Sequence, residues 1–428
     1  MESADLIVSG CGQLVTCRGR GPGPVRKSDL RDLGVIERGC IASHKGRIVF
    51  VGGELECRAR IRLEPEGAFL HAGGLLGLPG LVDPHTHLPF AGSREDEFQL
   101  RLAGATYREL AAKGMGIQST VDATRSISKP DLVGLCIQRL DSMLRHGTTT
   151  VEAKSGYGLN LDDEIKQLES LAAADRRHPI DIVKTFLGAH EVPREYKARK
   201  QEYMDFLIQT ILPEVKANNL AEFFDVFCEE GVYGIEESRR LIRAAKQAGL
   251  KIKLHADEFV PLGGAQLAVN EGAVSAEHLI AITEDGILAM AQSPVTAIIL
   301  PGVPFFLMQD QKAPARRLID AGAVVALATD FNPGSSMTES QIFILQLAVF
   351  SLHMFIEEAI YAVTLNAAYG IDRHREVGSL EVGKKMDLVL CDAPNYAYLV
   401  YHFGINPVVH VIKDGRIVIR DRQRISLQ

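Results

Sequence analysis

The sequence predicts an α/β fold: a (β/α)8 barrel of the TIM type with a smaller composite β-domain built from N- and C-terminal segments. Three observations favour this fold. Eight short apolar runs recur between residues 80 and 330, stretches with helical periodicity separate them, and strand-like segments occupy both ends of the 428-residue chain. We therefore expect the barrel over residues 79–370, and a β-domain made of residues 1–78 and 371–428.

The first 78 residues read as short strands separated by glycine, proline and charged turns, with no long helical period. The strand-like segments are residues 5–10, 40–52 and 68–74. Residues 19–34 are rich in glycine, proline and charge, which predicts a surface loop.

The eight apolar runs predict parallel strands, because amphipathic stretches such as residues 162–174, 238–248 and 313–321 alternate with them. The runs are residues 80–88, 147–156, 181–190, 223–230, 251–259, 274–279, 297–302 and 324–330. Most of them end in a residue that can bind metal or carry a proton. Polar residues gathered at the C-terminal ends of barrel strands predict a catalytic rim.

Strand character returns after the last expected barrel helix, in residues 378–392 and 408–421. Two short β segments at opposite ends of a chain could hardly fold alone. We expect them to complete one β-domain with the N-terminal strands.

Composition narrows the class of partner. Hydrophobic residues make up 46% and charged residues 24%, and the net charge of −7 leaves no basic surface for nucleic acid or for an anionic membrane. We therefore expect a small-molecule substrate.

The seven cysteines include no Cys-x-x-Cys pair, and the N-terminus lacks the basic and apolar regions of a signal peptide, so we expect a cytoplasmic location. The longest uncharged stretch, residues 287–309, contains three prolines and a glycine and predicts helix, turn and strand rather than a membrane span.

Histidines concentrate at the expected rim. Five of the thirteen lie at or near the ends of the runs: His85, His87, His190, His255 and His278. His85 and His87 are separated by one residue, so in extended backbone their side chains share a side. With His255 in the fifth run, where its strand ends, and Asp330 as the last residue of the eighth, the rim offers three imidazoles and one carboxylate. This set suits Zn2+ or Fe2+.

We predict one divalent metal ion per chain, and the sequence leaves the choice between zinc and iron open. A second ion bridged by a carbamylated lysine is not expected, since Lys154 lies in the second run and the fourth run ends in Cys228, Glu229 and Glu230. A bound ion would lower the pKa of a water toward neutrality.

Glu258 lies three residues after His255, and His278 lies at the end of the sixth predicted strand; both could carry protons beside the metal. Two structural interpretations compete with this: His278 as a buried, hydrogen-bonded histidine, and Glu258 as a helix cap. Which of Asp330, Glu258 and His278 takes the first proton stays open.

The segment from Pro79 to His87 resembles the first-strand signature of the amidohydrolase superfamily, and residues 378–389 are similar to the segment by which such chains return to their β-domain. Six further segments closely resemble one branch of this superfamily, and the resemblance spans nearly the whole chain. They are residues 90–98, 102–110, 154–159, 186–193, 255–259 and 328–335. That branch hydrolyses the ring of 4-imidazolone-5-propanoate to N-formimidoyl-L-glutamate in histidine degradation.

The resemblance implies a set of site residues and a homodimer. The metal ligands would be His85, His87, His255 and Asp330, and the catalytic residues Glu258, His278 and Asp330. The substrate-binding residues would be Arg94, Tyr107, Tyr157, His190, Glu258, Asn332, Gly334 and Ser335. A guanidinium such as that of Arg94 suits the carboxylate tail of this substrate.

Two departures from the family pattern are present: Met115 interrupts an expected glycine triplet, and Glu277 stands where aspartate more often precedes His278.

Other mononuclear amidohydrolase activities, a nucleobase deaminase or a hydantoin-type cyclic amidase, are alternatives. Arg94 and the tyrosines favour an acidic substrate over these. A non-catalytic barrel would show a broken ligand set, whereas all four ligands and Glu258 are present.

Overall fold

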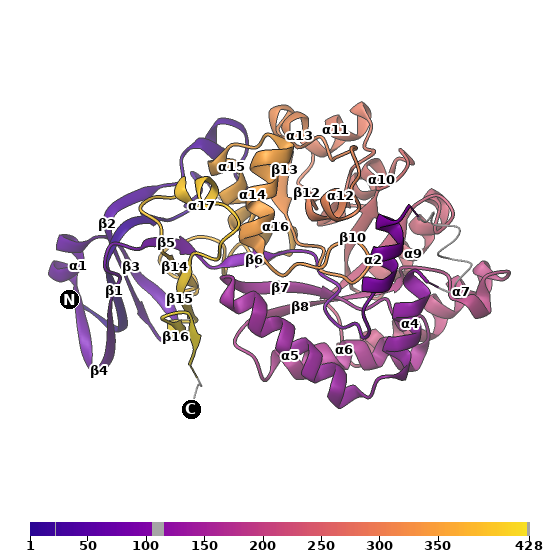
Figure 1. Cartoon of the computed structure of the whole chain (residues 1–428), viewed down its shortest axis with the longest axis horizontal. Helices are drawn as coiled ribbons and strands as arrows, with labels where there is room; N and C mark the ends of the chain where they lie inside the picture. Colours follow the sequence, from indigo (N-terminus) through magenta and orange to yellow (C-terminus); the bar gives the residue numbers. More distant parts are fainter. Residues whose placement is uncertain (22, 105–114, 426–428) are drawn as a thin grey trace.

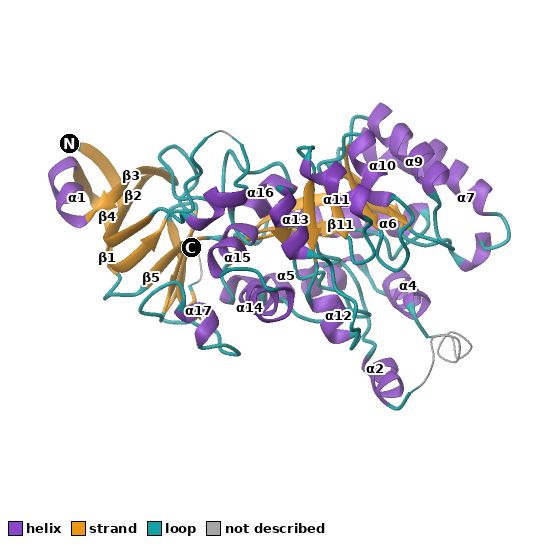
Figure 2. Ribbon diagram, turned by 90° about the horizontal axis from the view of Figure 1, so that it is seen from above, coloured by secondary structure: helices purple, strands orange, loops and turns teal. Residues whose placement is uncertain are grey.

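The computed structural model describes residues 1–21, 23–104 and 115–425, which form a helix-wrapped barrel with a second sheet at one end (Figure 1). In Figure 1 the indigo N-terminal strands and the yellow C-terminal strands lie together at the left, beside the barrel. Figure 2 shows helices on both sides of the barrel strands. Within the described residues, no helix is both long and apolar enough to cross a membrane.

The barrel sheet has eight described strands in chain order, and each pairs in parallel with the next. The strands are β6 (Leu81–Asp83), β7 (Thr148–Lys154), β8 (Asp181–Ala189), β9 (Phe223–Cys228), β10 (Lys251–Ala256), β11 (Ser275–His278), β12 (Thr296–Ile299) and β13 (Val324–Leu327). A parallel bridge between Thr86 and Phe331, just beyond β6 and β13, closes the barrel. The predicted fold class is confirmed, and each strand coincides with one apolar run to within a residue at its start.

Helices cover the outside of the barrel, and those expected at residues 162–174, 238–248 and 313–321 are present as α6, α9 and α13. The described α-helices between β6 and β14 are α2 (Glu95–Leu102), α4 (Ile117–Ser126), α5 (Lys129–Arg145), α6 (Leu161–Asp175), α7 (Lys200–Phe206), α8 (Leu212–Ala217), α9 (Ile235–Gln247), α10 (Gly264–Asn270), α11 (Glu284–Ala291), α12 (Gly302–Phe306), α13 (Ala315–Ala321), α14 (Gln341–Leu352), α15 (Ile356–Ala362) and α16 (Leu365–Gly370). Shorter helical turns are η2 (Arg194–Tyr196) and the π-helical η3 (Leu207–Ile211).

Helix α6 illustrates why these segments fold as they do. The Asn160 side chain accepts a hydrogen bond from the backbone N–H of Asp163 and so caps the first turn. One face of the helix then buries Leu168, Leu171 and Ala174. Burial of apolar side chains stabilises the packed helix by roughly 1.5–3 kcal/mol for a residue the size of leucine.

The second sheet combines strands from both ends of the chain. Its strands are β1 (Glu2–Val15), β2 (Val35–His44), β3 (Arg47–Gly53), β4 (Ile61–His71), β5 (Leu76–Pro79), β14 (Leu388–Cys391), β15 (Val408–Lys413), β16 (Arg416–Arg420) and β17 (Gln423–Arg424), and the short helices beside it are η1 (Lys27–Arg31), α1 (Glu54–Arg60) and α17 (Tyr398–Tyr401). Strand β14 pairs antiparallel with β5, which joins the C-terminal strands to the N-terminal ones.

The chain passes from one sheet to the other at Gly80, between β5 and β6. A Cβ atom at this position would lie 2.2 Å from Oγ1 of Thr149, which is closer than real contacts allow. Only glycine therefore lets the first barrel strand start so close to β7.

Residues 19–34 correct one prediction, because they are more than a surface loop. They contain the 3-10 helix η1, and Val25, Leu30 and Leu33 are buried. The Arg26 guanidinium donates hydrogen bonds to the carbonyl oxygens of Ala291, Ser293 and Gly322. The apolar residues in this segment follow no regular period. The prediction of a surface loop therefore depended on the glycine, proline and charge content alone.

Candidate active site

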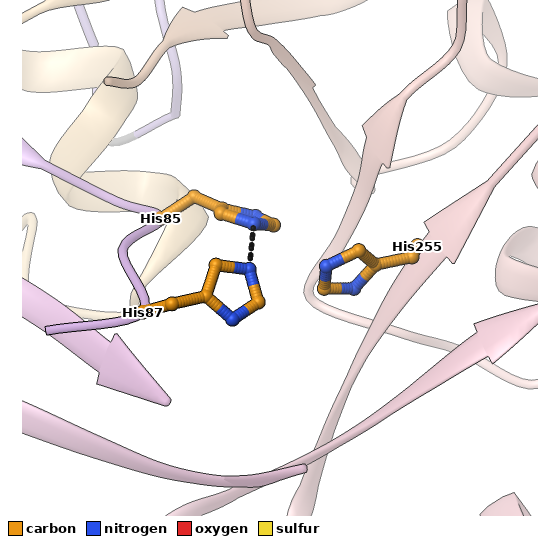
Figure 3. Close-up of side chains that lie close together, drawn as sticks. All are labelled: His85, His87 and His255. Atoms are coloured by element: carbon orange, nitrogen blue, oxygen red, sulfur yellow. Dashed lines mark hydrogen bonds between the residues drawn. The ribbon is translucent and has the colours of Figure 1, made fainter. Parts of the chain in front are cut away.

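Three histidines meet at the C-terminal edge of the barrel. His85 and His87 follow β6, His255 lies in β10, and all three are buried. Their ring centroids are 4.6 Å (His85 and His255), 5.3 Å (His85 and His87) and 5.6 Å (His87 and His255) apart. Figure 3 shows the three rings facing one another. The structure thus brings together the three imidazoles that the sequence predicted as metal ligands.

Asp330 lies beside these rings because closure of the barrel places the end of β13 next to β6. Its Oδ1 is 3.2 Å from Nε2 of His85 and 3.3 Å from Nε2 of His87. Its backbone N–H donates to the carbonyl oxygen of His85, and its φ of 51° lies in the left-handed region. His278, at the end of β11, also has a positive φ, of 70°. Such backbone strain in residues other than glycine is concentrated at functional sites.

The donor atoms fit a divalent cation. Nε2 of His85 and Nε2 of His87 lie 3.3 Å apart, and within the described part of the chain Nε2 of His255 has no hydrogen-bond partner, while the neighbours of Asp330 Oδ1 are the Nε2 atoms of His85 and His87. Donor atoms of His85, His87 and His255 all lie within 4.8 Å of one another. Buried polar atoms without partners cost about 1–3 kcal/mol each, and a bound ion would satisfy them together.

Electrostatics also favour a cation here. Burial lowers the pKa of His85, but the carboxylates of Glu277 and Asp330 outweigh it and raise this pKa to about 9. The same carboxylates would stabilise a cation at this place, and a bound ion would displace the proton from His85. Burial lowers the pKa of His87 to about 4 and keeps that ring neutral, as a metal ligand must be.

Five charged side chains are fully buried inside the barrel next to the histidines, and the sequence reasoning did not recognise them as a group. They are Glu152, Lys154, Asp225, Lys253 and Glu277. The Lys154 ammonium lies 2.9 Å from Oε1 of Glu152 and 2.9 Å from Oδ2 of Asp225, so it is engaged in ion pairs. The available signal was a charged residue inside an otherwise apolar strand, as in residues 223–228.

Glu258 and His278 lie together beside the metal ligands. Oε1 of Glu258 is 3.5 Å from Nδ1 of His278, and the His278 ring centroid is 5.1 Å from that of His255. Burial lowers the pKa of His278 well below its usual value. Burial, with the nearby carboxylates of Asp330 and Glu229, raises the pKa of Glu258 well above its usual value. These environments favour a neutral imidazole and a protonated carboxyl group.

The contacts of these two side chains differ from those that the structural interpretations expect. Neither ring nitrogen of His278 has a hydrogen-bond partner in the described ranges, so it is not a hydrogen-bonded core histidine. Helix α10 is capped by Asp257 rather than Glu258, since the Asp257 carboxylate accepts from the backbone N–H groups of residues 263, 264 and 265.

Arg94 lies against the loop that follows β13. Its Nε and Nη2 donate to the two carboxylate oxygens of Glu97, at 2.9 and 2.6 Å, which leaves Nη1 free of that pairing. A Cβ atom on Gly334 would lie 2.2 Å from Nη1 of Arg94. Gly334 therefore provides the space that the guanidinium occupies.

Tyr157 and His190 extend the group of rings at His87. The His190 ring stacks on that of His87 at 4.9 Å between centroids, and the Tyr157 ring lies 5.3 Å from His190. Nδ1 of His190 is 3.0 Å from the carbonyl oxygen of Gly156, an arrangement that places the proton on Nδ1 and leaves Nε2 as an acceptor.

Asn332 organises the loop that contains Gly334 and Ser335. Its Oδ1 accepts from the backbone N–H groups of both residues at 2.8 Å, and its Nδ2 donates to the carbonyl oxygen of Asp330. Its side chain thus holds the loop beside Asp330. Tyr107 lies outside the described residues.

The two departures from the family pattern differ in their surroundings. Gly116, which follows Met115, has a φ of 97° and donates its backbone N–H to Glu97. Glu277 is fully buried, and its Oε2 lies 2.5 Å from Nδ1 of His85.

The chain matches the model of the amidohydrolase family over residues 76–418. It is similar to the imidazolonepropionase of Symbiobacterium thermophilum, at 47% identity over 98% of both chains, and to that of Geobacillus kaustophilus, at 50% identity over 97% of this chain and 98% of the relative.

Among solved structures, the fold is similar to an adenosine deaminase from Xanthomonas campestris with bound zinc, with a TM-score of 0.71 at 20% identity over 100% of this chain and 95% of the other. It is also similar to a triazine hydrolase variant, with a TM-score of 0.75 at 15% identity over 99% and 96% of the two chains. At such identities these neighbours bear on the fold alone.

Proposed function

The chain belongs to the amidohydrolase family and within it to the imidazolonepropionases, and from this premise we propose how its rim residues open 4-imidazolone-5-propanoate to N-formimidoyl-L-glutamate, a step of histidine degradation. The observation that carries the proposal is the convergence of His85, His87, His255 and Asp330 in a chain that matches imidazolonepropionases from end to end. A nucleobase deaminase or hydantoin-type amidase is not favoured, because eight relatives at 45–50% identity carry the one name.

We infer that one divalent ion, zinc or iron, is held by these four residues. Such an ion polarises a carbonyl group and lowers the pKa of water at the site. The partnerless donor atoms support this ligand set, and the ion pairs of Lys154 support a single ion, since that lysine is not free to bridge two.

Ring opening requires two proton movements. Water adds to the ring carbonyl carbon and loses a proton, and the carbon–nitrogen bond then breaks as the ring nitrogen gains one. Neutral His278 can accept a proton at a ring nitrogen, and protonated Glu258 can donate one to the departing nitrogen. The Asp330 carboxylate is a second acceptor at the same place.

The substrate's carboxylate tail is assigned to Arg94, with Tyr107, Tyr157 and His190 near the ring. Glu97 occupies the Nε and Nη2 edge of Arg94, and no described residue accepts a hydrogen bond from Nη1, which supports a carboxylate bound on that edge. Asn332, Gly334 and Ser335 shape the loop against which the guanidinium lies.

The proposal also includes the domain boundaries, the oligomeric state and the cellular location. The domains are residues 1–78 with 371–428, and residues 79–370, a division supported by the pairing of β5 with β14. The family resemblance supports a homodimer. The seven free, buried cysteines support a reducing, cytoplasmic location.

The function is tested by incubating metal-analysed protein with freshly prepared imidazolonepropionate and following loss of the ring absorbance. We expect ring loss with N-formimidoyl-L-glutamate as the product. Absence of ring loss at every zinc or iron loading, together with turnover of a nucleobase, would overturn the assignment.

Arg94→Gln is expected to raise KM for imidazolonepropionate and to lower kcat/KM by roughly 10- to 100-fold, since hydrogen bonds to charged groups contribute about 1.5–3 kcal/mol. Steady-state kinetics measure this. The matched control is Arg194→Gln, because Arg194 is an exposed arginine that pairs with Asp122. A variant at Arg94 with wild-type KM would show that the carboxylate is bound elsewhere.

A further inference from the structure

Two buried carboxylates contact the far nitrogens of two proposed metal ligands. Asp225, on β9, places Oδ2 2.9 Å from Nδ1 of His255, and its Oδ1 also accepts from the His255 backbone N–H at 3.2 Å. Glu277, on β11, places Oε2 2.5 Å from Nδ1 of His85. An imidazole that donates from Nδ1 to a carboxylate carries its lone pair on Nε2, the nitrogen that faces the proposed ion.

Two lysines hold these carboxylates in place. Nζ of Lys154 lies 2.9 Å from Asp225 and 3.2 Å from Glu277, and so joins the two. Nζ of Lys253 lies 2.7 Å from Oε1 of Glu277, 2.8 Å from Oγ of Ser275 and 3.1 Å from the carbonyl oxygen of Gly370. Each lysine is fully buried, and an isolated charge would be costly there. Lys154 pairs with the same oxygens that contact the histidines, Oδ2 of Asp225 and Oε2 of Glu277, whereas Lys253 pairs with the other oxygen of Glu277. These ion pairs fix the geometry of the two carboxylates.

Glu277 reaches across the inside of the barrel to two other segments of the chain. It starts on β11 and reaches His85, which follows β6, while its other oxygen reaches Lys253 on β10. The shorter aspartate would withdraw the carboxylate by about one carbon–carbon bond from both partners. The glutamate thus connects three strands of the barrel at one carboxyl group.

We propose that Asp225 and Glu277 are positioning residues for the metal, which fix the Nδ1–H tautomer and the orientation of His255 and His85. The inference rests on the proposed function only in taking His85 and His255 as ligands. It predicts that losing either carboxylate weakens metal binding through the histidine that it holds.

The chain offers a matched control in Glu152. Its Oε1 is 2.9 Å from Nζ of Lys154, in the same buried cluster, but its described partners are Lys154, Thr185 and the backbone N–H of Thr86 rather than a histidine ring. Glu152→Gln therefore removes the same charge from the same cluster without releasing a ligand.

The test is a Zn2+ titration of the metal-stripped full chain against a competing chromophoric chelator. Asp225→Asn and Glu277→Gln are expected to raise the Kd for Zn2+ by roughly 10- to 100-fold, and Glu152→Gln by less than about threefold. Equal Kd values in the wild type and the two variants would overturn the inference, as would an equal loss in Glu152→Gln. Zinc binding by the wild type without ring opening would instead count against the proposed function and leave this inference standing.

A second measurement needs no substitution and keeps the inference testable if a variant fails to fold. Nitrogen-15 NMR of the zinc-loaded wild-type protein reports the protonation of each histidine nitrogen. We expect His85 and His255 to carry a proton on Nδ1 and none on Nε2. A proton on Nε2 of either ring would refute the proposed tautomer.

Discussion

His255→Ala is expected to weaken zinc binding by at least about a hundredfold and to lower ring opening by roughly a thousandfold or more. The substitution removes one of four donors, and metal catalysis contributes several kcal/mol to such reactions. It also leaves the Asp225 carboxylate without the histidine partner that now lies 2.9 Å away.

Metal content per chain and turnover at saturating substrate measure this effect. His178→Ala is the matched control, because His178 is also buried but pairs with Asp141, which lies on α5 on the outside of the barrel. We expect the control to retain metal and turnover. A His255→Ala protein with wild-type metal content and turnover would remove His255 from the ligand set.

His278→Asn is expected to leave metal content nearly intact and to lower kcat by about a hundredfold or more, the usual contribution of a general acid or base. His278 lies beside the ligands rather than among those proposed, and its ring nitrogens have no partner in the part of the chain described. Asparagine keeps a polar side chain of similar reach, but its amide group cannot accept and return a proton near neutral pH.

The control for this substitution is His410→Asn, on β15 in the second sheet, where the imidazole is likewise mostly buried. Metal analysis must accompany the kinetics, because a fall in turnover with loss of metal would make His278 a ligand instead. Wild-type turnover in His278→Asn would defeat its role in proton transfer.

The barrel could be predicted because each of its strands is a short apolar run next to a helical period. Metal-binding residues at the ends of those runs then followed from one rule, that parallel strands end at a common edge. His85 and His87 needed only the alternation of an extended strand, and Asp330 needed the closure of the barrel.

The charge cluster inside the barrel could not be predicted in the same way. Glu152, Asp225 and Lys253 lie on three different strands, and sequence spacing does not tell which charges face each other across a barrel. The role of Asp257 as the cap of α10 was hidden for a related reason, since the adjacent Glu258 fits a helix cap equally well by residue type.

The contacts of Arg94 are a third feature that the sequence could predict only in part. The pairing with Glu97 is local in sequence and could have been suspected, but the contact with Gly334 depends on how two loops from opposite ends of the barrel domain meet. Gly334 looked like a turn residue, and its close approach to the guanidinium explains the need for glycine.

Ring opening measured against bound metal per chain tests the central claim most directly. Metal-stripped protein is reloaded in steps with Zn2+ or Fe2+, and the rate of imidazolonepropionate hydrolysis is recorded at each loading. The account predicts a rate that rises in proportion to bound metal and levels off at one ion per chain. Full-rate ring opening by the metal-stripped chain, or a rate that appears only with a second ion, would contradict it.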